Sequence, residues 1–192
     1  NGVYQVDLAK NLLDNGNSKT QDDWIEYSKQ AQRNSGFYIA DFPLYFAVKR
    51  ALYQNRDSKF KDKIEEVRLF IKNSAIESWL MTSTRIIYNP QAQKDLVIHN
   101  YKQPDQYSKE LDSFIGKDGF ITSNEIDNVE SPLIALLDAN QPVQEINSIY
   151  KWLTDVDSYL YRVNSERQQK DERVVGFFAV SGRVDLYCCG DS

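Results

Sequence analysis

A chain of 192 residues, 41% hydrophobic and 27% charged, has the composition of a folded globular protein and not of a disordered tail. Its 28 acidic residues outnumber its 23 basic ones, for a net charge of −5, and lysine and arginine are interspersed with the acids, which argues against a nucleic-acid partner. No run of about 18 apolar residues occurs, so we expect no membrane span in this segment.

The first part of the chain, residues 1 to about 80, carries patterns typical of helices. Apolar residues at helical spacing predict a first helix from Val3 to Leu13, ended by the turn-forming Asn15. The sequence TQDD at 20–23 resembles a capping box with Asp in place of Glu, in which side chains bind the first free amides of a helix. It predicts a second helix that ends near Asn34.

Two further helices are predicted before the first strand. Asp41 followed by Pro43 predicts a helix that begins there and continues to about Tyr53. Its expected core-facing residues are Tyr45, Val48 and Leu52. From Ser58 to about Ser78, apolar residues recur every three or four positions with charged residues between them, which predicts a long amphipathic helix lying on a core.

Beyond about residue 80 the pattern changes to that of β-strands. Two β-branched and aromatic stretches, 84–90 and 94–101, predict a strand, a turn and a second strand. The segment 173–189 predicts another hairpin, with Ser181-Gly182 at its reversal.

Two helices are predicted between these hairpins. Ser131 followed by Pro132 is typical of a capped helix start. Pro142 predicts the start of the next helix, which we expect to continue to about Val163.

Strands grouped in hairpins, instead of alternating with helices, indicate an α+β fold. We therefore expect several amphipathic helices packed on an antiparallel sheet made from the two β-hairpins. The length predicts one domain over 1–192, with a helical part at about 1–80 and a mixed hairpin, helix and hairpin part at about 81–192.

The segment GKDGFITSNEI, residues 116–126, resembles the second half of a calcium-binding EF-hand loop. With Gly119 at the sixth position of that loop, Glu125 falls at the twelfth, where the motif needs a bidentate carboxylate. The first position, however, falls on Phe114, which has no side-chain oxygen to offer. Asp118 and Glu125 are therefore the two candidate metal ligands of a calcium-stabilised loop at 118–125.

The alternative for this segment is purely structural. Asp118-Gly119 is typical of a tight turn, and Thr122 with Glu125 is typical of a capping box that opens a short helix.

His99 is the one histidine in the sequence, which excludes zinc and iron sites built from two or more histidines. Strand alternation places His99 on the same face as Val97 and Tyr101. Because an imidazole pKa of about 6.5 suits a general base, His99 is the candidate catalytic residue. The alternative is a histidine that is packed in the core or faces solvent.

The adjacent cysteines Cys188 and Cys189 point to opposite faces of an extended strand and cannot bind one metal ion together. We interpret them as inert structural residues. Two cysteines do not make a secreted disulfide framework, so we expect a reducing, cytoplasmic setting, although a removed N-terminal leader stays open because the chain begins at Asn1.

Aromatic side chains are plentiful, and those with one polar end are favoured in binding surfaces. The candidate binding residues are Tyr101, Tyr107, Trp152 and Tyr161. Carboxylates gather at 125–130 and at 155–157, where they are either candidate Mg²⁺ ligands or a solvated surface near helix ends.

Three functions remain after these exclusions. The first is a non-catalytic protein-interaction or self-associating module, whose partner is another protein or a second copy. The second is a small hydrolase that uses His99 as base or a carboxylate-held Mg²⁺. The third is the calcium-stabilised loop at 118–125. We expect no cofactor, because the sequence has neither of the glycine-rich nucleotide-binding motifs.

Overall fold

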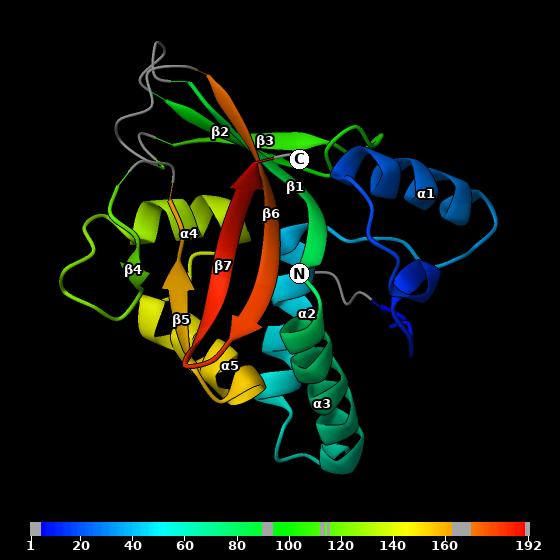
Figure 1. The fold of residues 1–192 in the computed structure, drawn as a ribbon. Helices are drawn as coiled ribbons and strands as arrows, with labels where there is room; N and C mark the ends of the chain where they lie inside the picture. The colour runs from blue at the N-terminus through cyan, green and yellow to red at the C-terminus, as the bar shows by residue number, and fades with distance from the viewer. Residues whose placement is uncertain (1–4, 90–93, 112–113, 115, 163–169, 191–192) are drawn as a thin grey trace.

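The computed structural model describes residues 5–89, 94–111, 114, 116–162 and 170–190, the last four of these by their backbone alone (Figure 1). The helical elements are η1 (Leu13–Gly16), α1 (Gln21–Arg33), α2 (Phe42–Gln54), α3 (Lys61–Glu77), α4 (Glu130–Leu137) and α5 (Val143–Thr154). The strands are β1 (Leu80–Tyr88), β2 (Asp95–His99), β3 (Tyr107–Leu111), β4 (Gly119–Phe120), β5 (Asp157–Leu160), β6 (Asp171–Val180) and β7 (Arg183–Gly190). No helix among these is long and apolar enough to cross a bilayer.

The α+β class is confirmed. Both predicted hairpins form, β1 with β2 and β6 with β7, and antiparallel pairing of β1 with β6 joins them in one sheet. The sheet order is β3-β2-β1-β6-β7-β5-β4, and β5 runs parallel to β7. The sheet is therefore larger than two hairpins, and mixed instead of antiparallel throughout. The additional strands β3, β4 and β5 have two to five residues each, too few for a clear alternating pattern.

Four helices supply the apolar surface that the sheet needs on one face. α2 contacts α4 and α5, α3 contacts β6 and α5, and α5 contacts β5. Figure 1 shows α4 and α5 behind β5 and β7, with α2 and α3 beneath β1 and β6. The largest fully buried apolar side chains in this core are Phe42, Phe46, Ile86, Phe114, Leu133, Leu136, Leu137, Ile146, Tyr150 and Phe177.

The predicted helix starts at α1 and α2 are confirmed by their caps. Thr20 accepts a hydrogen bond from the Asp23 amide, and Asp41 accepts one from the Leu44 amide. The predicted core face of α2 was wrong, because the buried residues of this helix are Phe42, Phe46 and Lys49.

The predicted helix at the N-terminus was wrong in the part that the structure describes. Residues 5–12 are irregular, and one 3-10 turn follows at Leu13–Gly16. An isolated helix of this length is marginal in water without a packed apolar face. Here Val6 and Leu8 stay more than 40% exposed, so no such face is buried.

Two predicted helical stretches in the second part of the chain were also wrong. α5 ends at Thr154, because Asp155 adopts a left-handed conformation with φ of 66° and residues 157–160 pair with β7. Residues 122–125 form a turn and not a helix, with the Glu125 amide bound by the Ser123 hydroxyl at 3.1 Å. α4 begins at Glu130 with Val129 as N-cap, so Ser131 does not cap it.

Strand β1 is continuous from Leu80 to Tyr88, but its pairing with β6 is interrupted at residues 82–84, all of them fully buried. Met81 pairs with Gly176 and Arg85 pairs with Val174. Between these two pairs β1 advances by four residues and β6 by only two, so β1 carries two extra residues. The interruption takes the polar backbone groups of 82–84 out of regular pairing, and buried groups of this kind need other partners.

Gln21, the first residue of α1, binds two of these backbone groups. Its amide nitrogen Nε2 donates to the carbonyl oxygens of Thr82 at 2.8 Å and Thr84 at 2.9 Å. Its oxygen Oε1 accepts a hydrogen bond from Nε of Arg85 at 2.8 Å. One buried side chain therefore joins α1 to both ends of the interruption.

Ser83 connects the interruption to two loops. Its amide donates to the carbonyl oxygen of Ala40 at 2.9 Å, just before α2, and its carbonyl oxygen accepts from the amide of Tyr101 at 2.8 Å, just after β2. The interruption thus holds the start of α2 and the end of β2 in place.

We predict that Gln21→Ala lowers the free energy of unfolding by about 2–4 kcal/mol, because two buried carbonyl oxygens and a guanidinium lose their partner. Urea denaturation measures the loss. Gln30→Ala is the matched control, since Gln30 is exposed on the same helix, and we expect a change below about 0.5 kcal/mol. Equal losses in the two variants would contradict the role of Gln21.

Candidate functional site

His99 is fully buried, and both of its ring nitrogens have partners within the chain. Nε2 lies 2.9 Å from the carbonyl oxygen of Ala135, which can only accept, so Nε2 carries the proton. Nδ1 lies 3.1 Å from Oγ1 of Thr84, which accepts from the amide of Phe42 at 2.9 Å and donates its own hydrogen to Nδ1. The ring is neutral, and burial lowers the pKa of His99. This geometry disfavours a role for His99 as a general acid or base. Its hydrogen bonds instead connect α2, β1, β2 and α4.

The four candidate binding aromatics lie in separate contacts. Tyr101 stacks with Arg85, whose Cζ is 4.0 Å from the ring centroid. Asn100 has a φ of 50°, which ends β2 before Tyr101. The Tyr107 hydroxyl donates to Oδ2 of Asp138 at 3.0 Å, and its ring lies 4.9 Å from that of His99.

The other two aromatics belong to the helical layer and to the far side of the sheet. Trp152 on α5 packs edge-on against Tyr53, with ring centroids 5.7 Å apart. Tyr161 follows β5 and accepts a hydrogen bond on its hydroxyl from Nη2 of Arg183 at 2.6 Å. In the described part of the chain the four residues have different neighbours, so their role in binding stays a prediction.

The two candidate calcium ligands have other partners. Oδ1 of Asp118 accepts from the amide of Arg162 at 2.6 Å, which ties the loop to the end of β5. Glu125 is exposed and lies 3.8 Å from Nζ of Lys117. No group of three or more metal-ligating side chains occurs in the described part of the chain.

The acids at 155–157 are ion-paired. Asp155 pairs with Arg68 and Lys72 of α3, and Asp157 pairs with Lys151. They serve to join α3 and α5 and to stabilise the end of α5. The side chains of Cys188 and Cys189, interpreted above as inert, lie outside the described residues.

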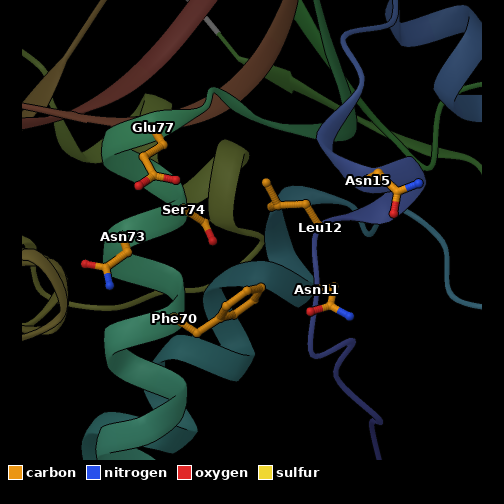
Figure 2. A pocket seen from close by; sticks show the side chains of 7 residues that line it. All are labelled: Asn11, Leu12, Asn15, Phe70, Asn73, Ser74 and Glu77. Carbon is orange, nitrogen blue, oxygen red and sulfur yellow. The ribbon is translucent and has the colours of Figure 1, made fainter.

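A cleft that the sequence did not predict lies between the N-terminal segment and α3 (Figure 2). Its volume is about 540 Å³. The lining residues are Asn11, Leu12, Asn15, Phe70, Asn73, Ser74 and Glu77. Figure 2 shows Asn11 and Leu12 on one wall across from Phe70 and Ser74 on the other. The irregular course of the N-terminal segment therefore creates the cleft, since a helix there would present a different set of side chains.

The walls of this cleft combine apolar and polar groups. Leu12 and Phe70 are half-buried, whereas Asn11, Asn73 and Glu77 are exposed. Glu77 is the last residue of α3, where the helix dipole disfavours a negative charge. Among the residues that the structure describes, no side-chain hydrogen bond or ion pair involves Asn11, Asn73 or Glu77. These groups are available to a partner.

Exposed apolar side chains lie on α3 next to the cleft. Leu69 and Ile76 are 43% and 52% exposed. They are seven residues apart, which places them two turns apart on one helix face, with Asn73 between them. The cleft and this face together form a surface with both apolar and hydrogen-bonding character.

A second feature is a lysine inside the core. Lys49 of α2 is 1% exposed, and its Nζ has no hydrogen-bond partner. Four rings surround Nζ, with centroids 5.8 Å away for Phe42, 5.3 Å for Tyr45, 4.9 Å for Tyr150 and 3.8 Å for Phe177. The rings attract a cation, but burial disfavours charge more strongly and lowers the pKa of Lys49 to about 7.

Comparisons with known proteins add no family: no family model, no curated protein and no solved structure matches this chain.

We predict that His99 makes stability fall as the pH drops below about 6.5. The unfolded chain then binds a proton at His99 that the folded chain does not, because burial lowers the pKa in the folded state. The free energy of unfolding of His99→Gln should lose less between pH 7 and about 5.5 than that of the wild type, as measured by urea denaturation. Identical losses would show that His99 is not the group responsible.

We predict that Lys49 makes stability rise between about pH 7 and about pH 10. In that window the unfolded chain holds a proton on Lys49 that the folded chain does not, so this residue contributes up to about 1.4 kcal/mol per pH unit. Below about pH 7 both states are protonated and the contribution is constant.

Lys49→Met removes this dependence and should be more stable than the wild type at pH 7. The measurement is the difference in the free energy of unfolding between the variant and the wild type across the window. Lys117→Met, at a side chain that is 71% exposed, is the control and should follow the wild type.

Proposed function

We propose that this chain is a non-catalytic protein-interaction module whose cleft binds a basic, extended peptide segment of another protein. The observation that carries the proposal is the cleft of about 540 Å³ whose exposed Asn11, Asn73 and Glu77 have no side-chain partner among the described residues. A catalytic alternative lacks comparable support, because both nitrogens of His99 are engaged inside the fold.

The chemistry of the walls favours a peptide. Carboxamide side chains donate and accept hydrogen bonds at once, as a peptide backbone requires. Three of them, on Asn11, Asn15 and Asn73, line the cleft, and Leu12 with Phe70 can take an apolar side chain.

Charge favours a basic partner. Glu77 lies at the end of the cleft on α3 without a described cation, and the chain as a whole carries a net charge of −5. A lysine or arginine of the peptide would pair with Glu77 and would also relieve the unfavourable position of that carboxylate at the helix C-terminus.

A peptide display library panned against the whole chain tests the proposal. We expect enriched peptides to contain a lysine or arginine beside an apolar residue and to bind with dissociation constants at or below about 10 μM. In fluorescence polarisation, Glu77→Lys should weaken binding at least about tenfold through charge repulsion, and Asn11→Ala should weaken it by a smaller factor. Glu125→Lys makes the same charge change outside the cleft and should leave binding unchanged.

Three outcomes would overturn this proposal. One is that the library yields no binder, and another is that Glu77→Lys binds the selected peptides as tightly as the wild type does. The third is that light scattering finds a dimer that Leu69→Ser with Ile76→Ser converts to a monomer. In that case the surface beside the cleft is occupied by a second copy of the chain.

A further inference from the structure

Lys49 is unusual because a buried amine normally has a hydrogen-bonding or charged partner. None of the groups around Nζ supplies one: Phe42 and Tyr45 come from α2, Tyr150 from α5 and Phe177 from β6, and each presents a ring. The hydroxyl of Tyr150 is buried in the same part of the core and also has no hydrogen-bond partner. Two polar groups without partners therefore belong to one apolar cage.

We propose that Lys49 is a nucleophilic amine that condenses with a small aldehyde or ketone to form an imine inside the cage of Phe42, Tyr45, Tyr150 and Phe177. The inference is independent of peptide binding at the cleft, because Lys49 belongs to α2 and does not line that cleft. Since Lys49 and the rings of Phe42, Tyr150 and Phe177 are almost wholly buried, the carbonyl compound must be small.

The physical basis is the desolvated state of the amine. A lysine in water is almost wholly protonated at neutral pH and is then not a nucleophile, whereas desolvation in an apolar pocket favours the neutral form. The titratable groups that face Nζ are Tyr45 on its own helix and Tyr150 on α5, and burial raises the pKa of both hydroxyls. Both stay neutral, so no anion holds the proton on Lys49.

The reaction balances without an oxidant or a metal. The lone pair of Nζ attacks the carbonyl carbon, a C–N bond forms, and the carbonyl electron pair moves to oxygen. Tyr150 can donate a proton to that oxygen and recover one from the nitrogen. Loss of water then leaves the C=N bond, so one carbonyl compound and one amine give one imine and one water molecule.

Reductive trapping tests the proposal on the whole folded chain. Propanal is the probe, sodium cyanoborohydride reduces any imine, and peptide mass spectrometry measures the propylated fraction at each lysine. Lys63 and Lys117, with side chains 64% and 71% exposed, are internal controls. At pH 7.5 an exposed lysine is neutral in about one molecule in a thousand. We therefore expect Lys49 to react at least about tenfold faster than either control.

Three further readouts separate a reactive lysine from one that is merely buried. The rate at Lys49 should level off above about pH 8. Tyr150→Phe should slow the reaction at Lys49, whereas Tyr27→Phe, on α1, should not. Unfolding in urea should remove the advantage of Lys49. If Lys49 in the folded chain reacts more slowly than Lys63 at every pH, the amine is closed off and the proposal is wrong.

Discussion

The backbone of residues 82–84 imposes the constraint on which much of the fold depends. These residues are fully buried in the middle of the sheet, yet the shift of register between β1 and β6 leaves their polar groups without regular strand partners. Residues distant in the sequence supply the missing hydrogen-bond partners. The side-chain amide of Gln21 donates to the carbonyl oxygens of Thr82 and Thr84, and the carbonyl oxygen of Ala40 accepts from the amide of Ser83. Because unpaired buried backbone groups are costly, the attachment of α1 and the start of α2 follow from one irregularity in one strand.

The Thr84 side chain extends the same network to the helical layer. It links the first amide of α2 to His99, and His99 in turn reaches the carbonyl oxygen of Ala135 in α4. Every group in this path has a partner, which is the arrangement expected of a structural network. Lys49 and Tyr150 show the opposite arrangement, since each is buried without a partner. In this core the lone histidine is therefore a satisfied structural group, whereas Lys49 is a buried amine without a hydrogen-bond partner.

Local patterns were sufficient for the elements whose signals lie within a few residues. The caps at Thr20 and Asp41, the long amphipathic run of α3 and the reversal at Ser181-Gly182 all formed as predicted, because each depends on neighbours in the chain. The predicted helix at the N-terminus failed because amphipathic spacing does not supply a surface to pack against. β5 was missed because its four residues become a strand through parallel pairing with β7, more than twenty residues away.

The sequence by itself determined the α+β class, the two hairpins and the absence of the multi-histidine and glycine-rich sites, because composition, period and residue counts are properties of the chain alone. Only the tertiary structure decided that His99 has both nitrogens engaged, that Lys49 points into a cage of aromatic rings, and that the N-terminal segment and α3 line an open cleft. Burial and hydrogen bonding of these groups depend on residues far apart in sequence, and a local pattern carries no information about which distant side chain will arrive beside it.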